Sequence, residues 1–170
     1  MIEKVKNILN RKHLLIIGKS EKDRHKFINN LITDVNFETF RFPSKMKSFD
    51  EYFDFIKKEK LYKPWYKAKS YNINQILDFH WDWISENNSL IIMEEFEQME
   101  ERWRIELMRI YINEIENRKK GEKKIHLIIS QENENSLVEK VSKVISTRTN
   151  ERRTNYQIVQ QNLETINISE

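Results

Sequence analysis

Three runs of consecutive apolar residues divide the chain: HLLII at 13–17, LIIM at 90–93 and IHLII at 125–129. Runs that are apolar on both faces are typical of strands covered by helices in a parallel sheet. Between them lie longer segments in which apolar residues recur at helical spacing. Strands that alternate with helices predict a three-layer α/β/α sandwich with a mainly parallel sheet.

The remaining elements follow from the same pattern. Ser20, with Asp23 three residues later, is typical of a helix N-cap. Residues 37–42 alternate and indicate a more exposed strand, which Pro43 ends. The helices expected from periodicity cover residues 2–10, 20–32, 49–56, 72–87, 97–120 and 134–145; residues 147–155 are basic and loop-like, and residues 156–168 are expected to hold one or two strands.

Length and composition restrict the class of protein. A chain of 170 residues is large enough for one core, so we expect a single domain over 1–170. With no cysteine, the chain has no disulfide, thiolate metal site or cysteine nucleophile. No apolar run approaches the roughly 18 residues of a membrane span, and the N-terminus lacks the apolar core of a signal peptide. We therefore expect a cytoplasmic protein with no membrane partner.

Polar residues follow each of the three apolar strands. Gly18 ends the first strand and precedes a helix capped by Ser20, which is the geometry in which helix N-termini bind phosphate. Glu94 and Glu95 follow the second strand, and Ser130 follows the third. Because α/β proteins bind ligands at the carboxyl ends of their strands, these residues are candidates for one site.

This order resembles that of the P-loop NTPases of the AAA+ type, whose Walker A turn, Walker B strand and sensor 1 strand occur in the same sequence. The segments most similar to that family are RKHLLIIGKSEKDRHKFINNLI, LIIMEEFEQM and KIHLIISQENENSLVEKVSKVISTR. They resemble clamp-loader small and delta-prime subunits and related loader ATPases. The resemblance implies ATP and Mg²⁺ as cofactors, other protein subunits as partners, and association with DNA.

The Walker A segment departs from the pattern GxxxxGK[ST]. Counted from Gly18, Asp23 replaces the second glycine, Arg24 the lysine, and His25 the hydroxyl residue. The carboxylate of Asp23 would repel a triphosphate. We therefore expect ATP binding to be weak or absent.

A second register takes Gly18, Lys19 and Ser20 as the GKS itself. These residues follow the strand directly, so no loop remains to wrap the phosphates. Either register loses part of the phosphate site.

If hydrolysis is retained, the resemblance assigns Glu95 as the base and Glu94 as the Mg²⁺ ligand. The family has an aspartate at the position of Glu94, so this glutamate would reach the metal with a side chain that is one methylene longer. Arg24 or Lys19 would contact phosphate and Ser130 would act as sensor 1. The resemblance also leads us to expect a core without the C-terminal helical lid that AAA+ modules normally carry. We therefore consider two functions, an active ATPase that uses Glu95 as base and Glu94 on Mg²⁺ and, as we favour, a catalytically inactive assembly subunit.

Basic residues near the C-terminus suggest a role in such an assembly. Arg148, Arg152 or Arg153 could act on the γ-phosphate of a neighbouring subunit, near the position of the family's serine–arginine finger. The alternative is a solvated basic loop.

A third function is nucleic-acid binding through residues 57–71, which hold six lysines against one glutamate. Lysines would neutralise phosphates and aromatic rings would stack on bases, although such rings also pack on protein cores. The candidate contacts are Lys63, Trp65, Tyr66, Lys67 and Lys69.

We predict that DNA binding weakens steeply as salt rises, because bound lysines release counterions. Alanine at Lys63, Lys67 and Lys69 should flatten this dependence, measured by titration at two salt concentrations. Unaltered binding by the variant would place the contact elsewhere.

Overall fold

The computed structural model describes residues 1–9, 11–33, 35, 37–42, 51, 54, 58, 89–105, 108–109, 125–133, 136–149 and 155–168. The helix expected over 72–87, the lysine-rich segment 57–71 apart from Lys58, and most of the helix expected over 49–56 lie outside these residues. Arg152 and Arg153 lie outside them as well.

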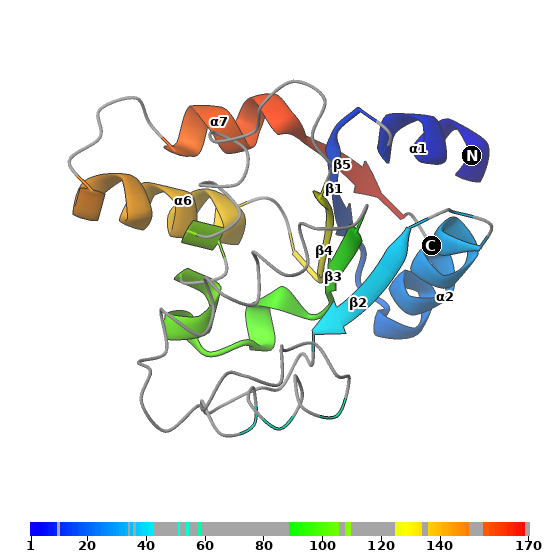
Figure 1. The fold of residues 1–170 in the computed structure, drawn as a ribbon, viewed down its shortest axis with the longest axis horizontal. Helices are drawn as coiled ribbons and strands as arrows, with labels where there is room; N and C mark the ends of the chain where they lie inside the picture. Colours follow the sequence, from blue (N-terminus) through cyan, green and yellow to red (C-terminus); the bar gives the residue numbers. More distant parts are fainter. Residues whose placement is uncertain are drawn as a thin grey trace, which may run out of the picture.

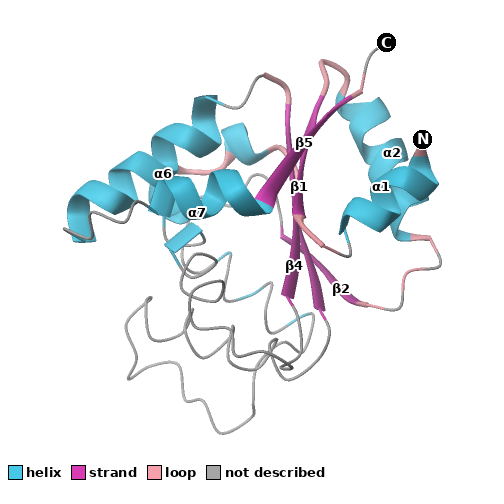
Figure 2. Cartoon of the chain, turned by 90° about the horizontal axis from the view of Figure 1, so that it is seen from above, coloured by secondary structure: helices cyan, strands magenta, loops and turns pink. Residues whose placement is uncertain are grey.

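A five-stranded sheet forms the centre, with the order β2-β3-β4-β1-β5 and every neighbouring pair parallel. Helices lie on both of its faces, α1 and α2 on one and α6 and α7 on the other (Figures 1 and 2). The predicted α/β fold with a parallel sheet is therefore confirmed. The strands are β1 (His13–Ile17), β2 (Glu38–Phe42), β3 (Ser89–Met93), β4 (Ile125–Gln131) and β5 (Leu163–Asn167).

The apolar runs form the inner strands because both of their faces are covered. Every residue of β1 is buried, as are Leu90 to Met93 of β3. On one face, alternate strand residues pack with the apolar stripes of α1 (Ile2–Leu9) and α2 (Glu21–Ile32). The buried members of this cluster are Val5, Leu9, Leu14, Ile16, Phe27, Ile28, Leu31, Leu90, Ile92 and Ile128.

The two edge strands are more exposed. In β5 every residue is partly or fully exposed, and among the described strands it pairs with β1 alone. The backbone N–H of Ile168 donates to the carbonyl of Ile17 at 2.8 Å and continues the pairing beyond the strand. Lys12 also reaches across to Glu164 at 2.9 Å.

The C-terminal elements differ from the prediction. Residues 155–162 form helix α7, which packs against α6, so only one strand follows. Glutamines favour this helix, and it buries Val159. Helix α6 (Ser136–Thr149) extends into the segment expected to be a loop, so Arg148 is helical.

The helix expected from Glu97 also starts differently. A short 3-10 helix, η2 (Phe96–Gln98), follows β3 and ends at Met99, whose backbone is extended. Helical residues resume at 101–105 and 108–109. Residues 94–100, which include η2, therefore separate β3 from the helical residues that begin at 101.

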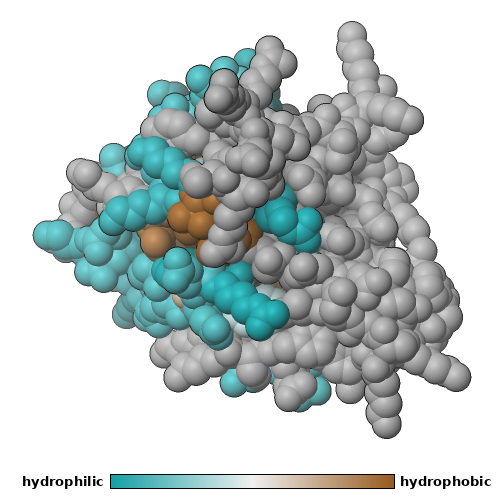
Figure 3. All heavy atoms as spheres, turned by 90° about the vertical axis from the view of Figure 1, so that its left-hand side faces the viewer, coloured by the Kyte–Doolittle hydropathy of each residue, from teal (hydrophilic) through white to brown (hydrophobic). Residues whose placement is uncertain are grey.

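On the side of the molecule where α6 and α7 lie, most of the described residues at the surface are hydrophilic (Figure 3). Figure 3 shows one small apolar area there, bordered by hydrophilic residues. Among the described residues, no helix is both long and apolar enough to cross a membrane.

We predict that Ile16→Ala lowers the free energy of unfolding by about 2–5 kcal/mol, because it truncates a fully buried side chain. Ile16 lies between Ser130 of β4 and Ile166 of β5. Urea denaturation measures the change. The control Thr165→Ala, at an exposed position of β5, should have little effect; equal losses would contradict the burial.

Candidate functional site

The polar ends of three strands meet at one edge of the sheet. Because β1, β3 and β4 are parallel, the residues that follow them lie at the same edge, as predicted. Strand β4 lies between the other two: Ile17 pairs with Gln131, and Met93 pairs with Ile129. Any direct contact between the turn after β1 and the acidic end of β3 must therefore cross β4.

The connection from β1 to α2 consists of three residues, Gly18, Lys19 and Ser20. Ser20 caps the helix, as predicted, since its hydroxyl oxygen accepts a hydrogen bond from the backbone N–H of Asp23 at 3.2 Å. A Cβ atom at Gly18 would lie 3.2 Å from the carbonyl oxygen of Ile168, so a side chain there would need its neighbour to move. Lys19 and Asp23 are exposed.

A left-handed residue shapes the acidic end of β3. Glu95 has φ 50° and ψ 48°, a conformation that costs a non-glycine residue roughly 1–2 kcal/mol. The chain then enters η2. The carboxylates of Glu94 and Glu95 contact different partners on α2, with His25 near Glu94 and Arg24 near Glu95.

Arg24 and Glu95 form a buried ion pair. Nη2 of Arg24 lies 2.5 Å from Oε2 of Glu95, and both side chains are 2% exposed. Nη1 of Arg24 also donates to the backbone carbonyl of Gly18, and the side-chain amide of Gln98 is 3.4 Å from the same carboxylate oxygen. Two buried atoms, Nε of Arg24 and Oε1 of Glu95, have no hydrogen-bond partner among the described residues.

Glu94 lies between two basic side chains. Its Oε1 is 2.9 Å from Nδ1 of His25, and its Oε2 is 3.4 Å from Nη1 of Arg41. Arg41 also donates to the side chain of Asn29. Burial raises the pKa of the Glu94 carboxyl above its ordinary value, although Arg41 and His25 oppose the shift.

Glu97 joins the ends of β3 and β4. Its Oε1 accepts a hydrogen bond from the backbone N–H of Glu132 at 3.2 Å. Burial raises the pKa of Glu97, and this hydrogen bond partly offsets the increase. Ser130 is fully buried on β4, and its hydroxyl has no hydrogen-bond partner in the described part of the chain.

The structure thus brings together most of the residues predicted at the strand ends. Arg148 is the exception, since α6 extends away from the sheet toward its C-terminal end (Figure 1). The candidate nucleic-acid contacts Lys63, Trp65, Tyr66, Lys67 and Lys69 lie outside the described residues. The sequence analysis missed Arg41, Asn29 and Glu97 as neighbours of the site.

The proximity of Glu21 to His25 was also missed, although the sequence indicates it. Glu21 and His25 are four residues apart, so they share one face of α2. By contrast, the roles of Arg41 and Asn29 depend on the pairing of β2 with β3, which local spacing does not specify.

We predict that Arg24→Ala lowers the free energy of unfolding by about 3–5 kcal/mol, because it leaves the Glu95 carboxylate buried without its cation. Arg24→Met/Glu95→Gln should recover part of this loss, since neither charge remains. Urea denaturation of the single and double variants measures the coupling. Strictly additive effects would contradict the ion pair.

The matched control is Arg41→Ala. Its side chain is 34% exposed at the ion pair with Glu94. This contact is only partly buried and is long, at 3.4 Å, so its loss should cost less than the loss of the fully buried Arg24–Glu95 pair.

Comparisons with known proteins support the fold. No family model matches the chain, and no curated protein does. A chain in "Structure of Drosophila ORC bound to AT-rich DNA and Cdc6" is similar, with a TM-score of 0.54 and 12% identity. The match covers 97% of this chain and 51% of that one, so this chain spans about half its length. At this identity the likeness shows the fold alone.

Proposed function

We propose that this protein is a catalytically inactive, AAA+-like assembly subunit of a DNA-associated complex, with weak or absent ATP binding. The observation that carries the proposal is the buried ion pair between Arg24 and Glu95. In this pair Arg24, which the family resemblance places at the phosphates, is bound to Glu95, which the same resemblance makes the catalytic base.

The contacts of Arg24 support weak nucleotide binding. Its two terminal nitrogens already bind Glu95 and the carbonyl of Gly18, so a phosphate would have to displace an internal partner. One carboxylate oxygen of Glu95, Oε2, is bound by this guanidinium. A base that must polarise water needs that carboxylate to face the nucleophile.

The short connection before α2 supports the same proposal. Phosphate loops present several successive backbone N–H groups to the ligand. Here the N–H of Gly18 lies 3.4 Å from the carbonyl of Gln131, and the N–H groups of Asp23 and Arg24 bind the side chain and carbonyl of Ser20. Three of the amides around the turn are thus used within the protein.

The surroundings of Glu94 oppose a magnesium role. Its two oxygens face His25 and Arg41, and both contacts compete with a bound cation. Mg²⁺ requires near-octahedral oxygen coordination, which a carboxylate held in this way supplies poorly.

The assembly part of the proposal rests on the fold. The similar chain belongs to a structure in which ORC is bound to DNA and Cdc6, as its title states. A chain that shares this fold, and whose candidate catalytic residues are bound to each other, is well suited to a structural role in an assembly. The lysine-rich segment 57–71 is the proposed contact with DNA.

We predict that MgATP leaves the melting temperature unchanged and that no phosphate is released. A ligand present at 100 times its Kd would add about 2.7 kcal/mol of stability. For a chain of this size that corresponds to a shift on the order of 5–10 °C. Differential scanning fluorimetry with MgATP, with MgCl₂ at the same ionic strength as control, measures it.

A shift of several degrees, together with phosphate release that Glu95→Gln abolishes, would instead establish the ATPase. A shift without phosphate release would make the protein a nucleotide-binding subunit.

A further inference from the structure

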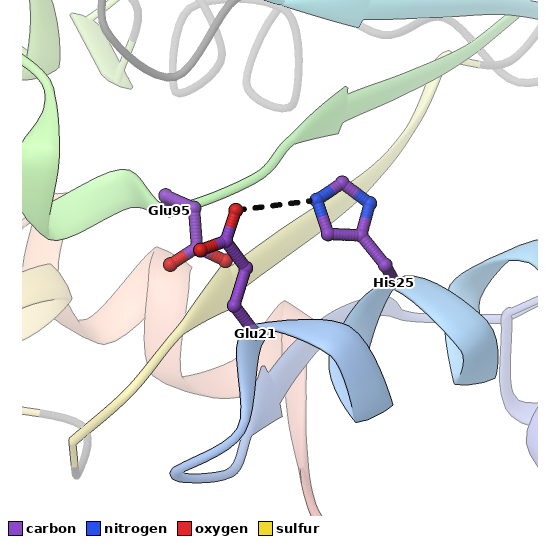
Figure 4. A group of neighbouring side chains, drawn as sticks. All are labelled: Glu21, His25 and Glu95. Carbon is purple, nitrogen blue, oxygen red and sulfur yellow. Dashed lines mark ion pairs between the residues drawn. The ribbon is translucent and has the colours of Figure 1, made fainter.

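Three potential metal ligands gather at the start of α2. Glu21 and His25 come from consecutive turns of the helix, and Glu95 comes from the end of β3. One ligand atom from each lies within 4.8 Å of the other two. Figure 4 shows the imidazole facing the carboxylate of Glu21, beside the carboxylate of Glu95.

The burial of Glu95 provides a second observation. Its side chain is 2% exposed, and Arg24 binds only Oε2. Oε1 is buried and has no hydrogen-bond partner among the described residues. A buried carboxylate oxygen without a partner is costly, and a cation at this position would satisfy it.

The carboxylate of Glu94 lies next to the imidazole of His25. Nδ1 of His25 lies 2.9 Å from Oε1 of Glu94, whereas Nε2 faces Glu21 at 3.7 Å. With its proton on Nδ1, the ring presents the lone pair of Nε2 to the cluster. Histidines that bind metals usually donate the N–H of their second nitrogen to a carboxylate, and the carboxylate of Glu94 is the group next to this nitrogen.

The local charge favours a cation. Three carboxylates, from Glu21, Glu94 and Glu95, surround the cluster, against the guanidiniums of Arg24 and Arg41. With His25 neutral, these five groups sum to one net negative charge. A divalent ion would therefore be attracted despite the two arginines.

The donor set selects the class of ion. Mg²⁺ and Ca²⁺ prefer oxygen ligands, whereas an imidazole with carboxylates suits Zn²⁺ and related transition metals. Metal–ligand bonds of about 2.0–2.2 Å require two ligand atoms to lie within roughly 4 Å of each other. The three side chains must therefore move slightly closer together when the ion binds. Glu21 and His25 have side chains that are 58% and 38% exposed and are free to adjust, while Arg24 holds Glu95 in place.

We propose that Glu21, His25 and Glu95 bind a first-row divalent transition-metal ion such as Zn²⁺, which connects α2 to the end of β3. Because Glu21 is exposed, solvent can reach the ion and fill its remaining coordination positions. The site uses a set of ligands different from that of a nucleotide-bound magnesium and does not require ATP.

Isothermal titration of the EDTA-treated full chain with ZnCl₂ tests the site, without nucleotide. We expect one equivalent to bind and Glu21→Gln or His25→Gln to weaken its Kd by more than about tenfold, because each removes one ligand of three. Both residues are partly exposed, so the variants should fold; circular dichroism checks this.

Matched controls separate this site from incidental binding. Glu3→Gln removes an exposed glutamate that pairs with Lys6, and His80→Gln removes a histidine from another part of the sequence. Both should bind Zn²⁺ as the unmodified protein does. Equal binding by all four variants, or competition by an equal concentration of Mg²⁺, would overturn the proposal. Because no nucleotide is present, either result leaves the assembly function untouched.

Discussion

The contact between Arg24 and Glu95 is the constraint on which the edge of the sheet depends. Removing a guanidinium and a carboxylate from water costs several kcal/mol for each ion, and only a close, well-supported pair recovers that cost. The 2.5 Å contact, the carbonyl of Gly18 and the amide of Gln98 provide this support. Since the two residues are 71 positions apart, the pair forms only when α2 and β3 are both in place.

The same pair explains the strained backbone after β3. Glu95 adopts a left-handed conformation that an ordinary residue avoids. This conformation accompanies the change from strand to η2 and allows adjacent glutamates to contact different partners. The cost of about 1–2 kcal/mol is small beside the penalty of leaving either buried charge alone. The turn and the ion pair therefore stabilise each other.

Much of the fold follows from the sequence because the inner strands are apolar on both faces. The runs at β1, β3 and β4 therefore mark the centre of the sheet directly. Helix α7 was missed because alternating residues near Val159 resemble a strand, and its packing against α6 is a tertiary effect. The cap at Ser20 was predictable because it depends only on residues three positions apart.

The site was predictable in its location but not in its contacts. Parallel strands place Gly18, Glu94, Glu95 and Ser130 at one edge whatever their partners are. Arg24, however, shares the inner face of α2 with Phe27, Ile28 and Leu31, at helical spacing. That pattern indicates a buried arginine, which requires a carboxylate nearby. Only the order of the strands identifies that carboxylate as Glu95.

Several polar atoms at this edge still need a partner. Among the described residues, the hydroxyl of Ser130, Nε of Arg24 and Oε1 of Glu95 are buried without a hydrogen bond. Each such group costs about 1–3 kcal/mol unless water or an ion satisfies it. A purely structural edge would be expected to carry apolar residues here, since these pack without this cost. The metal ion proposed above would satisfy one of these atoms, Oε1 of Glu95, while Oε2 of the same carboxylate stays bound to Arg24.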